Sequence, residues 1–235
     1  MVTMIELDFL RLQMWRLKKG LPQKNRCNLE RPTFSVGLTP ALSTTDTYFI
    51  MYGMVNSAIM DLIVANHGEE TWQRVKFKAG VEEEIFISND AYPDELTYRL
   101  VGAASEVLEQ PANVILIQFG RWWVLDTALK NYGHLMKFGG RNLGEFLKNL
   151  PNFHTRVVMM FPKLQPPTFE CIDLGPMELQ LHYRSHRRGL SAFVIGLLEG
   201  LGEMFKVRVT ITHEERLDDG ADHDVFHVSW SEAKP

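Results

Sequence analysis

Length, composition and charge exclude several classes of protein. The 235 residues suffice for one large domain or two small ones, and 45% apolar with 23% charged residues is typical of a soluble globular chain. A net charge of −4 and two widely spaced cysteines, Cys27 and Cys171, indicate neither nucleic-acid binding nor a disulfide framework. No apolar run approaches the length of a membrane span. Because a disulfide framework is excluded, a reducing cytoplasm is the expected compartment.

The charge balance changes along the chain. Residues 1–50 contain seven Lys/Arg and four Asp/Glu, a net charge of +3, which leaves −7 for the rest of the chain. Residues 32–46 are rich in Thr, Ser, Pro and Gly without apolar periodicity, as is typical of a linker. We therefore expect residues 1–50 to be an N-terminal extension, disordered or outside the domain, and residues 51–235 to form one domain.

The first part of this domain has helical periodicity. Apolar residues recur at intervals of three and four, and Gly68, Pro111 and the Gly139-Gly140 pair interrupt the pattern. Pro151 is well placed at the first position of a helix. The predicted helices span residues 51–67, 69–78, 94–109, 112–130, 143–148 and 151–160.

The last part has a different pattern. Residues 168–171 are expected to be extended, and apolar residues alternate with polar ones from Met177 to Arg184, which is typical of a half-buried strand. A long apolar helix is predicted over 189–205, and strands over 206–213 and 223–230 flank the turn sequence Asp218-Asp219-Gly220. The predicted fold class is therefore α+β, with a helical N-terminal part followed by a small antiparallel sheet with an inserted helix.

His154 is the first residue that suggests chemistry. On a helix, Leu150, Val157 and Val158 are its neighbours one turn away, so its imidazole is expected to point towards the core. Most such histidines are core residues that bond a backbone carbonyl. A buried neutral imidazole in apolar surroundings is also a suitable single axial ligand for the iron of a porphyrin. The chain lacks a Cys-x-x-Cys-His attachment sequence, so any heme would be noncovalent.

The second feature is Tyr183-Arg184-Ser185-His186-Arg187. In an extended segment Tyr183, Ser185 and Arg187 would point to one face and present three donors in a row. Such a row suits a ligand with two carboxylates, one of which the arginine can bind bidentately. The alternative interpretation is an ordinary solvated strand end.

These features and three others occur together in one family. The additional motifs are Met51-Tyr52-Gly53-Met54-Val55-Asn56, Gly68-Glu69-Glu70-Thr71-Trp72 and Asn149-Leu150-Pro151-Asn152-Phe153-His154, the last followed by Phe161-Pro162 and Pro167-Thr168-Phe169-Glu170-Cys171. In this order the motifs resemble the H-NOX (heme nitric oxide/oxygen binding) family, which includes the heme domain of soluble guanylate cyclase. The resemblance covers essentially all of residues 51–235 and none of 1–50. Pro151 is a departure, because an acidic or polar residue is common there.

The resemblance implies a noncovalent heme b sandwiched between the two halves of the domain. It implies that His154 is the proximal iron ligand, and that Tyr183, Ser185 and Arg187 bind the propionates. It further assigns porphyrin packing to Pro167, the distal pocket to Val55, Trp123, Phe193 and Leu197, and a hinge to Gly120 and Gly196. The glycines have a second interpretation, close packing of one helix on another, and the distal residues have an ordinary core interpretation.

The resemblance also implies a function. In oxygen-binding members a tyrosine on the helix after the Tyr-x-Ser-x-Arg segment donates to the bound gas, and the matching position here is Phe193. We therefore expect a sensor of nitric oxide that also binds carbon monoxide but not oxygen. The chain is expected to be a sensor rather than an enzyme, signalling in trans to a histidine kinase or a cyclic-dinucleotide enzyme.

Two other functions remain open at this stage. One is a heme enzyme of the peroxidase or nitric oxide dioxygenase type, which would need a histidine or arginine acid–base pair opposite His154. The other is a binding module for a different apolar ligand that carries carboxylates. Trp123 has an indole N–H that can donate a hydrogen bond, so weak oxygen binding also stays open.

Overall fold

The computed structural model of the protein describes residues 49–232. The predicted N-terminal extension, residues 1–50, lies outside this range except for its last two residues. The first described element is β1 at Ile50, one residue before the expected start of the domain. The proposal that the extension is separate from the domain therefore stays a prediction.

The N-terminal part consists of helices and one short antiparallel pair of strands. Its elements are β1 (Ile50–Tyr52), α2 (Gly53–Lys78), β2 (Ala91–Pro93), α3 (Asp94–Leu108) and α4 (Ala112–Trp122). Gly68 has a φ of 83° and breaks α2, as the sequence predicts. The antiparallel pairing of β1 with β2 was not predicted, because strands of three residues have no detectable alternation.

The predicted helix over residues 112–130 is longer than expected and not uniform. After α4 the chain continues as a π-helical segment, η1 (Trp123–Ala128), and then as α5 (Leu129–Gly139). Two helices follow, α6 (Leu143–Lys148) and α7 (Leu150–Met160). Asn142 caps α6 by accepting a hydrogen bond from the Glu145 N–H at 2.9 Å.

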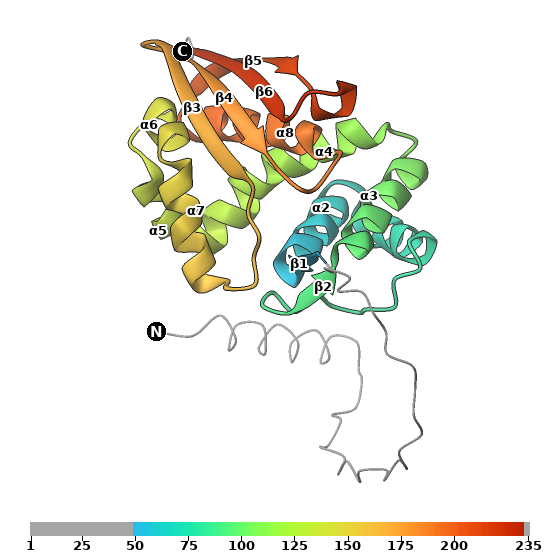
Figure 1. The fold of residues 1–235 in the computed structure, drawn as a ribbon. Helices are drawn as coiled ribbons and strands as arrows, with labels where there is room; N and C mark the ends of the chain where they lie inside the picture. Colours follow the sequence, from blue (N-terminus) through green and yellow to red (C-terminus); the bar gives the residue numbers. More distant parts are fainter. Residues whose placement is uncertain (1–48, 233–235) are drawn as a thin grey trace, which may run out of the picture. The chain divides into compact units, whose positions relative to one another are not determined.

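The C-terminal part is a four-stranded antiparallel sheet with one helix inserted. Its elements are β3 (Thr168–Gly175), β4 (Glu178–Arg184), α8 (Ser191–Met204), β5 (Val207–Glu215), the 3₁₀ turn η2 (Leu217–Asp219) and β6 (Asp224–Glu232). The strand order is β3-β4-β6-β5. The predicted α+β fold class is thereby confirmed (Figure 1).

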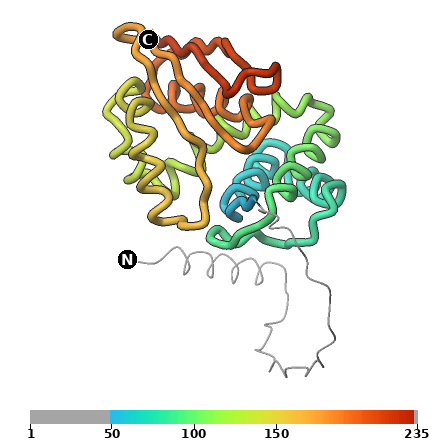
Figure 2. The backbone as a smooth tube through the Cα atoms, in the orientation of Figure 1, coloured from blue at the N-terminus to red at the C-terminus, as the bar shows by residue number. Residues whose placement is uncertain are grey.

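The register of the sheet places its apolar residues on one face. Leu181 pairs with Phe226 across β4 and β6, and Leu179 pairs with Val228; all four are fully buried. This face packs on α8, which lies between the sheet and α4, as the tube in Figure 2 also shows. The sheet therefore anchors one half of the fold.

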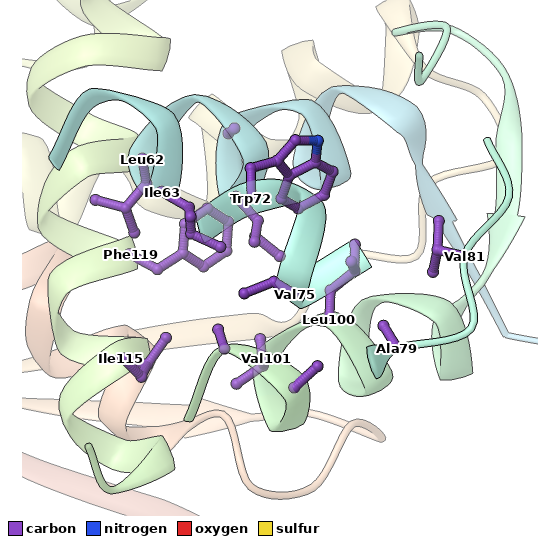
Figure 3. Close-up of a cluster of buried hydrophobic side chains, with 14 of the residues drawn as sticks. Leu62, Ile63, Trp72, Val75, Ala79, Val81, Leu100, Val101, Ile115 and Phe119 are labelled. Carbon is purple, nitrogen blue, oxygen red and sulfur yellow. The ribbon is translucent and has the colours of Figure 1, made fainter. Parts of the chain in front are cut away.

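The hydrophobic interior has two parts. The first core joins α2, α3 and α4, and Figure 3 shows its labelled residues, Leu62, Ile63, Trp72, Val75, Ala79, Val81, Leu100, Val101, Ile115 and Phe119. The second core joins η1, α5, α6 and the start of α7 to α8 and the inner face of the sheet. Trp123 packs against both cores.

Two glycines allow α4 and α8 to cross closely. A Cβ added to Gly120 would lie 2.3 Å from the Phe193 carbonyl oxygen, and one added to Gly196 would lie 2.1 Å from the Ile117 carbonyl oxygen. Any larger side chain would force the helices apart. The close-packing interpretation of these glycines is therefore correct, whereas their role as a hinge stays a prediction.

Within the described residues, no single helix is long and apolar enough to cross a membrane. Residues 94–108 and 112–139 meet the criteria of length and composition only as a pair of segments bent by 113°.

A pair of truncations tests where the domain begins. Tyr52 of β1 is buried, its ring lies 5.2 Å from that of Phe161, and its hydroxyl accepts a hydrogen bond from the Lys163 N–H. A chain that starts at Ile50 is expected to melt at the temperature of the full chain. A chain that starts at Gly53 should melt several degrees lower, because burying an aromatic ring stabilises by about 1.5–3 kcal/mol. Equal losses in both truncations, measured by calorimetry, would show that residues 1–49 belong to the fold.

Candidate functional site

A cavity of about 500 Å³ lies between the two hydrophobic cores. This volume is within the usual range for small-molecule sites. Its wall is mostly apolar and comes from both halves of the fold. Every residue to which the sequence assigned a ligand contact lies on this wall, namely His154, Tyr183, Ser185, Arg187, Pro167, Val55, Trp123, Phe193 and Leu197. The predicted hinge residues Gly120 and Gly196 do not line it.

His154 reaches the cavity from α7. Pro151 lies in the first turn of this helix, where a missing N–H costs nothing, so the departure from the family pattern leaves the helix intact. The imidazole stacks on Phe169 of β3, with ring centroids 5.4 Å apart and an interplanar angle of 9°. This contact fixes the plane of the ring against the sheet.

The imidazole is suited to ligate a metal. Burial lowers the pKa of His154, and the Leu150 carbonyl one turn earlier opposes that shift without completing a hydrogen bond to the ring. The side chain is therefore neutral at neutral pH, as a metal ligand must be. Its Nδ1 is buried and faces the Leu150 carbonyl without a hydrogen bond of full geometry.

Tyr183 supplies a second polar group at the cavity. It lies on β4, buried on the inner face of the sheet, opposite Phe169 of β3. Burial raises the pKa of its phenol, an effect that the Ser185 hydroxyl partly opposes. The phenol therefore stays protonated and can donate a hydrogen bond.

The extended geometry predicted for residues 183–187 is wrong beyond its first part. Strand β4 ends at Arg184, and the chain then bends through residues 185–189. Ser185 accepts a hydrogen bond from the Arg187 N–H at 3.0 Å, which stabilises the bend. Tyr183, Ser185 and Arg187 still line the same cavity, but a turn rather than a strand brings them together.

Arg187 has partners that the sequence did not reveal. Its Nε donates to Asp94 Oδ2 at 2.6 Å, its Nη1 to the Gln165 carbonyl at 2.8 Å, and its Nη2 to the Ile50 carbonyl at 2.9 Å. Both ion-pair side chains are more than nine-tenths buried. Asp94 begins α3, where an acidic residue is expected merely for its interaction with the helix dipole, so nothing in the sequence marks it as a partner of Arg187.

Most of the remaining wall is apolar, although Thr97, Tyr98, Tyr132 and Gln165 also line the cavity. Val55 comes from α2, Trp123 from η1, and Phe193 and Leu197 from α8. Phe119 of α4 also lines the cavity, with its ring 4.9 Å from that of Phe193, and was not predicted. Pro167 contributes from the segment that joins α7 to β3.

The cavity wall has little titratable chemistry. Among the described residues that line it, His154 is the single histidine and Arg187 the single arginine. No group of three or more His, Cys, Asp or Glu side chains in residues 49–232 could hold a metal ion. A heme enzyme of the peroxidase type would need a histidine or arginine acid–base pair opposite His154. The described residues that line the cavity contain no such pair.

Comparison with known proteins agrees with this geometry. A family model described as Haem-NO-binding matches residues 52–213. The chain belongs to this family. Members of the H-NOX family are heme-binding gas-sensor domains rather than catalysts, and the resemblance seen in the sequence is thereby confirmed.

Sequence relatives include soluble guanylate cyclases of animals. The chain is 32% identical over 179 residues to soluble guanylate cyclase gcy-31 of Caenorhabditis elegans, which covers 76% of the chain and 25% of that protein. It is 26% identical over 155 residues to soluble guanylate cyclase 89Db of Drosophila melanogaster, covering 66% and 23%. The chain thus spans about a quarter of the length of these relatives.

Solved structures share the fold. An H-NOX protein from S. oneidensis in the Fe(II)NO ligation state superposes with a TM-score of 0.71 at 20% identity, covering 77% of this chain and all of that one. The H-NOX domain of Shewanella woodyi in the Fe(II)CO ligation state gives 0.67 at 26% identity, covering 79% and 97%.

Replacing Arg187 with Ala tests two roles of this residue, its ion pair with Asp94 and its predicted contact with a ligand carboxylate. The variant leaves Asp94 buried and unpaired, so its free energy of unfolding should fall by about 3–5 kcal/mol. If Arg187 also binds a carboxylate of the heme that the family carries, heme should pass from the variant to apomyoglobin faster than from the wild type. The matched control is His186→Ala, since His186 is exposed and does not line the cavity. Equal heme-loss rates for the two variants would contradict the assignment of Arg187 to a ligand carboxylate.

Proposed function

We propose that this domain, residues 51–235, is a sensor that binds nitric oxide and carbon monoxide, but not oxygen, at a noncovalent heme b. The observation that carries the proposal is a single apolar cavity that brings together a neutral histidine, a buried phenol, a hydroxyl and a buried arginine. When bound, ferrous heme would supply an iron that can accept a histidine nitrogen and a diatomic gas as ligands.

His154 is the proposed protein ligand. Its neutral imidazole has a free lone pair, and stacking on Phe169 orients the ring. At the other polar part of the wall, Tyr183, Ser185 and Arg187 are the proposed partners of the two propionates. Pro167 is proposed to pack against the porphyrin. The apolar residues Val55, Trp123, Phe193 and Leu197 would exclude water from the gas-binding side.

The selectivity for gas rests on Phe193. Retention of oxygen as a ligand would need a hydrogen-bond donor, which the Phe193 ring cannot supply. Phe193 packs against Phe119, so a second apolar ring supports it. Nitric oxide and carbon monoxide need no such donor.

The signal is proposed to reach a partner protein through α7. Because His154 is part of this helix, a displacement of its imidazole would shift the helix, and the close crossing at Gly120 and Gly196 would be the pivot between the two halves. Arg156, Met159 and Met160 in the C-terminal half of α7 are exposed, so that half is accessible to a partner. The proposed partner is a cytoplasmic histidine kinase or cyclic-dinucleotide enzyme acting in trans.

Replacing His154 with Gly tests the iron ligand. The variant should lose its Soret band during purification and regain it when imidazole is supplied, because the small molecule can fill the vacated space. The control is His134→Gly, since His134 is exposed on α5 and does not line the cavity. A His154 variant that kept its heme without imidazole, together with a His134 variant that lost it, would disprove the assignment.

Spectra in air test the selectivity. The reduced protein should keep a five-coordinate visible spectrum in air-saturated buffer and change on adding nitric oxide or carbon monoxide. Phe193→Tyr should shift the protein towards oxygen binding, although incompletely, because neighbours must also orient the new hydroxyl. Phe77→Tyr adds the same hydroxyl at an exposed position of α2 that does not line the cavity, and should change nothing. A stable oxygen-dependent spectrum of the unmodified protein would refute the selectivity and implicate Trp123 as donor, while leaving heme binding intact.

A further inference from the structure

The Asp94–Arg187 ion pair connects the two halves of the fold beside the cavity. Arg187 comes from the turn between β4 and α8, whereas Asp94 starts α3 and Ile50 starts β1. A third acceptor, the Gln165 carbonyl, lies in the segment between α7 and β3. The guanidinium is thus held from three separate parts of the chain.

The two partners differ in their relation to the cavity. Arg187 lines the wall, but Asp94 does not. Asp94 takes the Nε hydrogen at 2.6 Å and lies 3.4 Å from Nη2, while Nη1 donates one of its two hydrogens to Gln165. The second Nη1 hydrogen has no acceptor among the described residues. Asp94 therefore binds the guanidinium without lining the cavity, and one Nη1 hydrogen remains for a ligand.

The carboxylate of Asp94 also acts on any anion in the cavity. A ligand carboxylate that approaches Arg187 meets a cation whose charge Asp94 already offsets, and in this buried setting little water screens the repulsion between the two carboxylates. Arg187 alone would attract the anion more strongly. The apo-protein, however, would then contain an unpaired buried cation, which is strongly destabilising.

We propose that Asp94 is a positioning residue that sets how tightly the cavity retains a ligand bearing carboxylates. It stabilises Arg187 when no ligand is present, and its charge weakens the hold of Arg187 on the ligand. The inference rests on the proposed heme site, since heme is the carboxylate-bearing ligand. If Asp94 only held Arg187 in place, its removal would weaken heme retention. The inference states the opposite, that removal of its charge strengthens heme retention.

Asp94→Asn separates the two roles. The asparagine oxygen can still accept from Nε, and the Ile50 and Gln165 carbonyls remain, so Arg187 stays in place without its counter-charge. Heme transfer from this variant to apomyoglobin should be several-fold slower than from the wild type, while the apo-protein should melt several degrees lower. Glu95→Gln is the matched control, because it removes an exposed negative charge from the same turn of α3 and should change neither quantity.

Heme dimethyl ester provides a probe without the carboxylates. If Asp94 acts through charge, Asp94→Asn and wild type should release the diester at the same rate. A difference that persists with the diester would overturn the inference. So would an Asp94→Asn variant that loses ordinary heme at least as fast as the wild type.

A second pair of variants covers the case in which Asp94→Asn does not fold. Arg187→Gln leaves Asp94 facing the ligand carboxylate unpaired, whereas Arg187→Gln/Asp94→Asn contains neither charge. The double variant should retain heme several-fold longer than Arg187→Gln alone, and equal rates would overturn the inference. Failure of the wild type to bind heme would overturn the proposed function and this inference together, whereas any of the variant results above would leave the proposed function standing.

Discussion

The close crossing of α4 and α8 is the constraint on which the rest of the structure depends. At Gly120 and Gly196 each helix meets the backbone of the other, so neither helix can move away without losing that packing. One hydrophobic core forms on α2, α3 and α4, and the other on α8 and the sheet. The two cores are in contact at this crossing. Beside the crossing they do not pack against each other, and the cavity lies there between them.

Polar groups on the cavity wall lie at few positions, and each is fixed by its neighbours. His154 is stacked on Phe169, Tyr183 is held by the sheet, and Arg187 is held by Asp94 and two backbone carbonyls. The outer parts of the sheet contain further polar pairs, such as the buried His213–Asp224 contact at 2.8 Å, which does not reach the wall. Orientation of a ligand with one metal and two carboxylates requires only this small number of fixed groups.

The sequence predicted the long elements well, because periodicity over ten or more residues is a strong signal. From the apolar helical context it predicted that His154 points into the interior, where it lines the cavity. The role of His154 as an iron ligand follows from the family resemblance and stays a prediction. It did not predict the bend after Arg184 or the partner of Arg187. Local patterns describe neighbours along the chain, whereas Asp94 lies 93 residues away and is brought to Arg187 only by the tertiary fold. The short pair β1–β2 has a similar origin, since its pairing depends on contacts rather than on its own composition.

The π-helical segment η1 determines which side chains of α4 and of the helix that follows face the cavity. Core positions recur every four residues from Leu116 through Gly120 and Val124 to Ala128. In a regular α-helix of 3.6 residues per turn, such a stride would rotate around the axis by roughly 120° over these three steps. The wider turns of η1 offset much of that rotation, so that Leu116 of α4 and Ala128 of η1 both line the cavity. Beyond η1 the backbone departs from helical angles again at Tyr132, within α5. Deletion of a single residue from η1 would leave both helices intact. It would nevertheless rotate α5 about its axis, so that different side chains of α5 would face the cavity.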